Sequence, residues 1–375
     1  MNFDLSDEQV LLREAARDAF GRVRTVEAAR EALEGGELPD LWPTARQAGW
    51  TGLLVDEEHG GAGLGAIDAM LVAAEAGRVL ASVPLLGHLP ATAVAGGGGL
   101  DDETLGKLAS GELRAAYVAA RPGDDVDPAW TVEPRSGRRR APAPQVARGG
   151  DGLATVNGTV CWVPDAVGAD VLVAVGVDAD GPVAVAFGPG AEGVAVEAAS
   201  GVYDATRPLG HVTFESACGR VLAAGEDELR RAWFLAHALI AAESLGAVEE
   251  CLQRSVAYAK ERYTFGRAIG SYQAIKHALT EVLRRQENTR SLLYYAGWAY
   301  EDKPEEFAAA ASAARAAGGA ALDFAAREVI SVHGGIGATW EHDAPLFFRR
   351  AQLSRRLLGG TGDAVDRLAG ELLAV

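Results

Sequence analysis

The chain has 375 residues, of which 49% are hydrophobic and 23% are charged, so it predicts a globular protein with a sizeable core. Its formal net charge of −17 argues against nucleic-acid partners and anionic membrane surfaces, because both require a basic binding face. No apolar run is long enough to span a bilayer, and the acidic residues 1–8 lack signal-peptide features. We therefore expect a soluble, cytoplasmic protein.

The cysteines and histidines do not indicate a metal site. Cys161, Cys218 and Cys251 are odd in number and far apart, which predicts neither a disulfide framework nor a tetrahedral metal site and fits a reducing compartment. His59, His88 and the other histidines also lack metal-ligand spacing. We interpret each histidine as a surface or capping residue.

The first third of the chain has the apolar spacing of helices. Ser6 predicts a helix start, because its hydroxyl can cap free amides while the acids that follow oppose the helix dipole. Further helices are predicted near residues 41–48 and 68–80. The glycine-dense segment 57–65 between them predicts a turn, since no Lys-Ser/Thr pair follows it as in a phosphate-binding loop.

The pattern changes near Ala115, where the helical period ends and short β-favouring runs begin. Their regular spacing between Gly, Pro and Asp residues predicts a small antiparallel sheet or barrel. The runs are 117–118, 153–156, 159–163, 170–177, 183–187, 194–196 and 211–214.

Helical periodicity returns after Gly225 and continues to the end of the chain. One long helix is predicted over residues 227–260, and a second is predicted to end at Pro304. The order of helices, strands and helices predicts an α+β protein with a β lobe between two helical lobes. We expect three domains, which comprise residues 1–113, 114–222 and 223–375.

Residues 261–270 join the two long helices with the sequence Glu-Arg-Tyr-Thr-Phe-Gly-Arg-Ala-Ile-Gly, and Gln273 follows. The segment combines a guanidinium, a hydroxyl, an aromatic ring and a carboxamide, which together suit a planar phosphorylated ligand. Taken alone, it fits helix packing with a solvated charge better than a ligand site, since single motifs are weak signals.

Motifs in the same order along nearly the whole chain resemble the acyl-CoA dehydrogenase family of flavoproteins. This resemblance implies an N-terminal all-α lobe, a middle antiparallel β-barrel lobe and a C-terminal four-helix bundle, assembled as homo- or hetero-tetramers. It implies α,β-dehydrogenation of an acyl-CoA thioester in lipid metabolism, with FAD as hydride acceptor and electron-transferring flavoprotein as electron acceptor. The motifs lie at residues 5–9, 49–54, 57–65, 162–163, 261–273, 333–337 and 357–361.

The resemblance also implies which residues contact FAD. Arg262, Thr264 and Phe265 would touch the ADP end of a neighbouring subunit's FAD. Trp162 would pack against the flavin ring, with a position in the barrel core as the alternative. Glycines would let the backbone approach the cofactor closely. The full set implied is Trp162, Arg262, Thr264, Phe265, Gln273, Gly334, Gly335, Gly337 and Thr361.

The family uses a carboxylate to take the α-proton. Neither of the two positions that the resemblance gives for this carboxylate holds an acidic residue. Gly359 occupies one position, or Gly360 if the alignment is shifted by one residue, and Ala236 occupies the other. Glu243 lies two helical turns, ~10 Å, from Ala236, and Asp363 lies about one turn from Gly359. Both are substitute candidates, and for both the alternative is an acid on a helix surface. The catalytic residue is therefore left unassigned.

Flavin-contacting positions are altered as well. The Thr-Glu-Pro pattern of the family is replaced by Ala-Arg-Pro at residues 120–122, Pro164 replaces a Thr, and Ser331 replaces a Gln. Because the Arg262 and Gly334 motifs are retained, we predict the base-lacking subunit of a hetero-oligomer. A same-fold flavoenzyme with other chemistry and a non-catalytic scaffold are the alternatives. The sequence does not indicate the acyl substrate.

Basic clusters stand out in this acidic chain. Residues 138–140 are three consecutive arginines, and pairs of arginines occur at 349–350 and 355–356. They are candidates for holding the phosphates of CoA or FAD. The alternative is that they pair with acids at subunit contacts.

Overall fold

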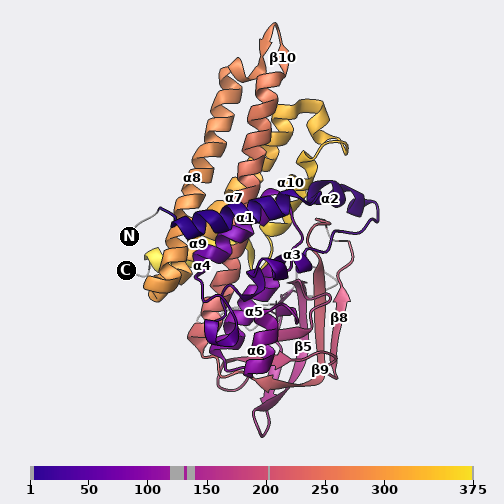
Figure 1. Ribbon diagram of the computed structural model, residues 1–375, viewed down its shortest axis with the longest axis vertical. Helices are drawn as coiled ribbons and strands as arrows, with labels where there is room; N and C mark the ends of the chain where they lie inside the picture. Colours follow the sequence, from indigo (N-terminus) through magenta and orange to yellow (C-terminus); the bar gives the residue numbers. More distant parts are fainter. Residues whose placement is uncertain (1–3, 119–130, 133–139, 202, 374–375) are drawn as a thin grey trace.

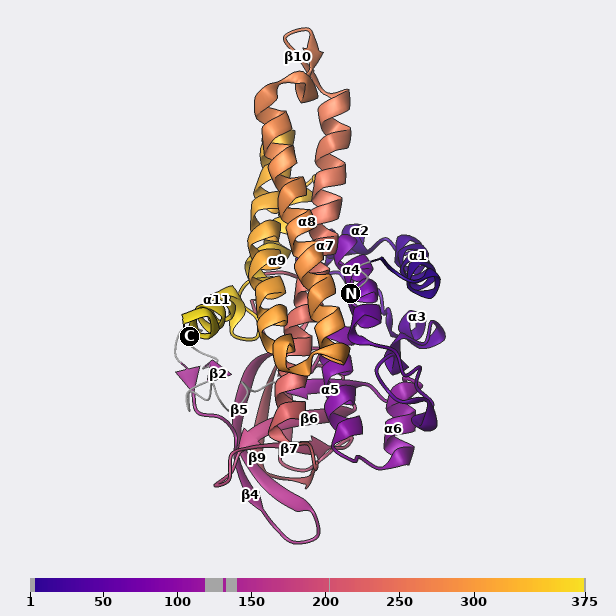
Figure 2. The same ribbon diagram turned by 90° about the vertical axis from the view of Figure 1, so that its left-hand side faces the viewer.

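The computed structural model of the protein describes residues 4–118, 131–132, 140–201 and 203–373. The predicted order of a helical lobe, a β lobe and a helical bundle is confirmed (Figures 1 and 2). The long helices α7, α8 and α9 run along the length of the molecule and extend past the β lobe at one end. Nowhere in the described ranges is a helix both long and apolar enough for a membrane span.

The N-terminal lobe begins where the sequence predicts. The Ser6 hydroxyl accepts a hydrogen bond from the amide of Gln9 at 3.2 Å, and the Gln9 side chain accepts one from the Ser6 amide at 3.1 Å. This reciprocal pair satisfies two otherwise free donors at the helix start. The helices are α1 (Asp7–Gly21), α2 (Thr25–Leu33), α3 (Trp42–Gln47), α4 (Ala66–Arg78), α5 (Leu85–Gly97) and α6 (Asp102–Ala109).

His88 connects the helical lobe to the β lobe. It is fully buried in α5, where its Nδ1 accepts a hydrogen bond from the Ala115 amide and its Nε2 lies 3.0 Å from the Thr51 carbonyl oxygen. Burial lowers the pKa of His88 to about 4, so the ring is neutral at pH 7. Our interpretation of His88 as a surface or capping residue is therefore wrong.

The β lobe is a closed barrel, as predicted. Antiparallel pairs β4–β5, β5–β9, β9–β7 and β7–β6, together with the parallel pair β6–β4, form a ring. β1 adds to β6 in parallel, and β8 adds to β9. The strands are β1 (Ala115–Val118), β2 (Thr131–Val132), β3 (Arg140–Ala141), β4 (Gln145–Arg148), β5 (Leu153–Pro164), β6 (Val171–Val177), β7 (Pro182–Phe187), β8 (Val194–Ala198) and β9 (Leu209–Val221).

The C-terminal bundle is built around α7. Every residue of α7 from 232 to 248 is buried, because α4 and α5 pack on one side and α8 and α9 on the other. A helix enclosed in this way needs no polar face. The bundle elements are α7 (Glu226–Glu261), β10 (Tyr263–Thr264), β11 (Arg267–Ala268), α8 (Gln273–Asp302), α9 (Pro304–His333), α10 (Ala344–Ser354) and α11 (Gly360–Leu373).

Helices α4 and α7 cross with their backbones in contact. A Cβ atom added at Gly77 would lie 2.1 Å from the carbonyl oxygen of Glu243, and one added at Gly246 would lie 1.8 Å from that of Ala74. Both distances are far below van der Waals contact, so only glycine fits on either side of the crossing. The crossing joins the N-terminal lobe to the bundle.

Replacing Gly246 by Ala should therefore destabilise the protein. We expect the free energy of unfolding to fall by about 1–3 kcal/mol, because the methyl group forces the two helices apart. The matched control is Gly370→Ala in α11, where an added Cβ meets no atom within 4 Å. The control should leave stability unchanged or raise it by about 0.5–1 kcal/mol. Urea unfolding measures both, and equal effects would contradict the close crossing.

Candidate functional site

The 261–270 segment forms a short hairpin at the extreme end of the molecule (Figures 1 and 2). Phe265 and Gly266 make the two-residue turn, with φ angles of 50° and 77°. Phe265 is 97% exposed and Tyr263 is 65% exposed. Two large aromatic side chains therefore face outward where the hairpin leaves the bundle.

The hairpin is held firmly at its base. The Tyr272 hydroxyl donates a hydrogen bond to the Thr264 carbonyl oxygen at 3.0 Å, and the Arg267 guanidinium lies 4.0 Å from the centre of the Tyr272 ring. Arg262 is exposed, and its side chain makes no ion pair within the part of the chain that the structure describes. Gln273, also exposed, begins α8. The predicted contact residues thus project from a rigid support.

The predicted glycine turn lies at the same end of the bundle. It follows α9, whose last residue, His333, stacks on Tyr258 near the end of α7 with ring centres 4.3 Å apart. A Cβ added at Gly334 or Gly335 would meet no atom within 4 Å. One added at Gly337 would lie 2.7 Å from the Ile330 carbonyl oxygen. Gly334 and Gly335 therefore border open space, whereas Gly337 is required for packing within the chain.

Trp162 lies elsewhere, in the β lobe at the opposite end from β10 (Figure 2). The β5–β9 register shifts between Val160 and Val163, and Trp162 has a φ of 61° at this bulge. Its half-buried ring meets His211 edge to face, with centres 4.9 Å apart. The bulge turns Trp162 away from the barrel core, which remains compatible with a ligand contact.

The two positions where the resemblance puts the base stand next to residues that the structure joins by a hydrogen bond. Ala236 is buried in α7, and Gly359 lies in the turn between α10 and α11 with a φ of 80°. His237 follows Ala236, and its Nε2 lies 2.9 Å from the carbonyl oxygen of Leu358, which precedes Gly359. Because that oxygen can only accept, Nε2 is the donor. Sequence reasoning missed His237, which stands in no motif.

Asp363 faces Gly359. A Cβ added at Gly359 would lie 2.5 Å from Oδ2 of Asp363, in the first turn of α11. Thr361 is close to α9. Its methyl carbon would lie 2.3 Å from a Cβ atom added at Gly319 in that helix. Thr361 therefore packs against α9, and Asp363 is the carboxylate that borders the Gly359 position.

Glu243 belongs to a buried group of charges that we call the inner charge cluster, made of Asp204, Arg207, Glu243 and Arg350. Oε2 of Glu243 is paired with Nη2 of Arg207 and lies 3.7 Å from Nη1 of Arg350. Oδ2 of Asp204 lies 2.6 Å from Nε of Arg350. All four residues are at most 7% exposed. The prediction of a helix-surface acid is therefore wrong for Glu243, because it lies in the stretch of α7, residues 232–248, that has no exposed face.

The inner charge cluster keeps the Asp204 carboxylate ionised. Burial acts to raise the pKa of Asp204, but Arg350 and hydrogen bonds from Thr206 outweigh it and hold that pKa below its usual value. For Arg207, burial acts to lower the pKa, but the charges of Glu243, Asp165 and Asp204 together with the hydrogen bond to Glu243 outweigh it and raise that pKa. A carboxylate held between two guanidinium groups is a poor proton acceptor. Glu243 is therefore unsuited to act as a base.

The basic clusters have separate environments. Arg350 is committed to the inner charge cluster, so its prediction as a phosphate ligand is wrong. Arg349 instead lies over the rings of Tyr203 and Trp340, at 4.5 and 5.0 Å. Arg355 lies 3.6 Å from Asp323, and Arg356, in the turn after α10, donates a hydrogen bond to the Gln352 carbonyl oxygen in that helix. The altered segment 120–125, Arg138, Arg139 and the Arg140 side chain lie outside the described residues.

Metal ions have no evident site. Within the described ranges, no three His, Cys, Asp or Glu side chains are grouped so that they could hold a metal. The chemistry available is therefore that of the outward-facing hairpin, the glycine turn, and the place where the buried α7 segment around Ala236 meets the exposed turn at Gly359 through His237.

Comparisons with known proteins give consistent matches over the whole chain. The family "Acyl-CoA dehydrogenase, N-terminal domain" matches residues 6–112, and "Acyl-CoA dehydrogenase, C-terminal domain" matches residues 235–370. Acyl-CoA dehydrogenase IpdE2 of Mycolicibacterium smegmatis is 30% identical over 98% of this chain and 100% of the relative.

Two solved structures share the fold. A variant of the Tcur3481-Tcur3483 steroid ACAD is 28% identical, covers 98% of each chain and has a TM-score of 0.85. The ChsE4-ChsE5 complex from Mycobacterium tuberculosis is 24% identical, covers 100% of each chain and also has a TM-score of 0.85. The predicted fold is therefore confirmed.

Replacing Glu243 by Gln tests the inner charge cluster. Without the carboxylate, Arg207 loses its partner inside the protein, and we expect the free energy of unfolding to fall by about 3–5 kcal/mol. The control is Glu301→Gln, because Glu301 is half exposed and lies 3.9 Å from Arg231 at the surface. The control should cost less than about 1 kcal/mol. A loss of similar size in both variants would contradict the assignment.

Replacing Gly359 by Glu tests whether the protein tolerates a carboxylate at the position where the resemblance puts the base. The left-handed φ of 80° and the nearby Asp363 oppose any side chain there, so we expect a loss of about 1–3 kcal/mol in unfolding free energy. Gly362→Glu is the control, because a Cβ there meets no atom within 4 Å. Thermal unfolding compares the two. If Gly359→Glu unfolds at the wild-type temperature, the strain argument fails.

Proposed function

The chain belongs to the acyl-CoA dehydrogenase family, and we propose that it is the base-lacking subunit of a hetero-oligomeric acyl-CoA dehydrogenase. Proteins of this family are oxidoreductases that bind FAD. The observation that carries the proposal is the hydrogen bond from His237 to the Leu358 carbonyl oxygen, which joins the sequence neighbours of Ala236 and Gly359. Both positions where the resemblance puts the base therefore lie in one region, and neither has an acidic side chain.

The dehydrogenation chemistry explains why this matters. Removing a proton from the α-carbon of a thioester requires a carboxylate in a water-excluding pocket, where it is basic enough to act. Glu243 is neutralised by arginines, and the Asp363 side chain is one methylene group shorter than that of glutamate. Losing general-base assistance lowers a rate by about 10²–10⁴-fold. We therefore assign proton abstraction to a partner subunit that carries the base.

The hairpin end supports a role in serving a neighbouring subunit. Phe265 offers an exposed ring, Arg262 an exposed guanidinium, and Gly334 and Gly335 an open backbone. These groups fit the adenine and pyrophosphate parts of FAD through stacking, charge-assisted hydrogen bonds and close backbone approach. They project away from their own β lobe, so they suit a cofactor bound mainly by another chain.

FAD would supply the hydride-accepting chemistry, and this chain's residues would position it. By resemblance, electrons would then pass to electron-transferring flavoprotein. On the chain's own side, Pro164 cannot donate a backbone or hydroxyl hydrogen bond, so Trp162 is the main predicted flavin contact there. The similarity to the ChsE4-ChsE5 complex and to the Tcur3481-Tcur3483 steroid ACAD supports a hetero-oligomer. Steroid-derived thioesters are therefore the first substrates to test.

Expression of the chain alone and with the dehydrogenase encoded beside it tests the proposal. We expect substoichiometric FAD and little acyl-CoA oxidation for the lone chain, and both at full level for the co-expressed complex. In the complex, Arg262→Gln with Phe265→Ala should reduce FAD occupancy, whereas Arg284→Gln on the surface of α8 should not. A lone homo-oligomer with full FAD and robust oxidation would contradict the proposal.

Asp363 supports a second candidate function, an enzyme that is active on its own. Its Oδ2 borders the Gly359 position, so it is the one substitute base that the geometry leaves open. In that case the lone chain would bleach its flavin with acyl-CoA under anaerobic conditions, and Asp363→Asn would abolish the bleaching. Reduction by a nicotinamide cofactor instead would indicate different chemistry on the same fold.

A further inference from the structure

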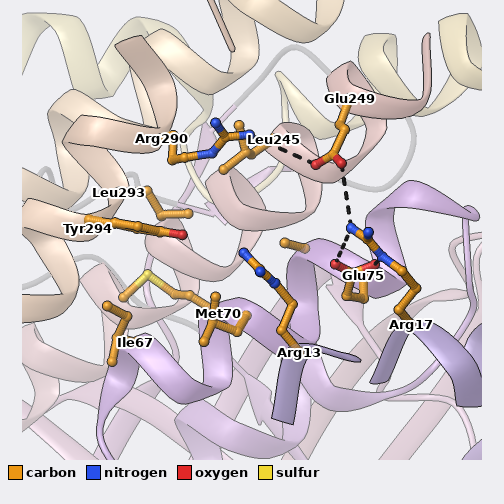
Figure 3. A pocket seen from close by; sticks show the side chains of 12 residues that line it. Arg13, Arg17, Ile67, Met70, Glu75, Leu245, Glu249, Arg290, Leu293 and Tyr294 are labelled. Atoms are coloured by element: carbon orange, nitrogen blue, oxygen red, sulfur yellow. Dashed lines mark hydrogen bonds and ion pairs between the residues drawn. The ribbon is translucent and has the colours of Figure 1, made fainter. Parts of the chain in front are cut away.

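A cavity of about 320 Å³ lies where α1 and α4 of the N-terminal lobe meet α7 and α8 of the bundle (Figure 3). None of its lining residues belongs to the hairpin, the glycine turn or the Ala236–Gly359 region. Its apolar wall is formed by Met70, Leu71, Leu245 and Leu293, each at most 5% exposed. Buried apolar walls of this kind give a cavity a fixed shape.

The cavity carries one excess positive charge. Arg13, Arg17 and Arg290 line it together with Glu75 and Glu249, three cations against two anions. Arg17 holds Glu75 through two hydrogen bonds of 2.9 Å and lies 3.5 Å from Glu249. Arg290 lies 4.0 Å from Glu249. Both carboxylates are therefore already paired, in a chain whose overall charge is strongly negative.

Arg13 is the cation left over. Its guanidinium points into the cavity, and the Tyr294 hydroxyl points toward it from α8 (Figure 3). Within the ranges that the structure describes, neither side chain has a hydrogen-bond or ion-pair partner. A guanidinium and a hydroxyl that converge beside apolar carbon atoms form a site for the head group of an amphipathic anion.

We propose that this cavity binds a short aliphatic carboxylate. The carboxylate would be held by Arg13 and Tyr294, and the alkyl part would lie against Met70 and Leu293. At about 30 Å³ for each water-sized group, the cavity holds about ten such groups, which fits a chain of roughly four to eight carbons. The ligand would touch both lobes and so favour their observed packing. The inference does not depend on the proposed function.

Methyl NMR tests this site directly, because the chain has only two methionines, Met1 and Met70. With ¹³C-labelled methionine methyl groups in the full-length protein, titration with hexanoate should shift the Met70 signal to saturation and leave the Met1 signal in place. The Met70→Leu variant assigns the signal. Hexylammonium and hexan-1-ol, matched in chain length and ionic strength, should produce no comparable shift.

Arg13→Gln should weaken hexanoate binding by at least about tenfold, since the charge-assisted hydrogen bonds are lost. Arg22→Gln is the control, because Arg22 is an exposed arginine at the end of the same helix that does not line the cavity. Tyr294→Phe should give a smaller loss. An unchanged Met70 signal, an equal response to hexan-1-ol, a response to phosphate but not hexanoate, or unaltered binding by Arg13→Gln would each overturn the proposal.

Discussion

The enclosure of α7 is the constraint on which the rest of the structure depends. Residues 232–248 are buried on every side, so this segment is stable only when both the N-terminal lobe and the bundle surround it. The glycine crossing with α4 brings one neighbour into backbone contact. The inner charge cluster then links α7 to α10 and to the loop before β9. One helix thereby fixes the relative positions of all three lobes.

The same helix separates the two regions relevant to function. Its enclosed part carries Ala236 and His237 beside the Gly359 turn, while its far end emerges from the bundle and supports the hairpin. Ala236 is buried in the enclosed part, whereas Gly359 in the adjoining turn is exposed, and Glu243 farther along α7 is paired with arginines. The exposed end has the opposite character, with aromatic and cationic groups and few contacts of its own. This contrast is what a subunit that serves its neighbours requires.

Much of the fold follows from local sequence patterns, because those patterns act locally. The Ser6 cap, the long helix over 227–260 and the strand runs depend on residues near in sequence, and all were predicted. Helix α5 was not predicted, since Pro90 and its glycines hide the helical pattern. The buried environments of His88 and Glu243 were misjudged, because they depend on partners 27 and 36 residues away or more. The hydrogen bond between His237 and Leu358, beside Ala236 and Gly359, is likewise a tertiary contact that no local signal reveals.

The Phe265 hairpin has an evolutionary consequence. Because the Phe265 side chain lies outside the core, replacing it changes the stability of the fold by no more than about 0.5 kcal/mol, whereas the left-handed backbone at Gly266 restricts replacement there. Natural selection can therefore alter which chains recognise one another without disturbing how each chain folds. Gene duplication followed by drift in such a tip would let one ancestral self-associating protein diverge into two that prefer each other.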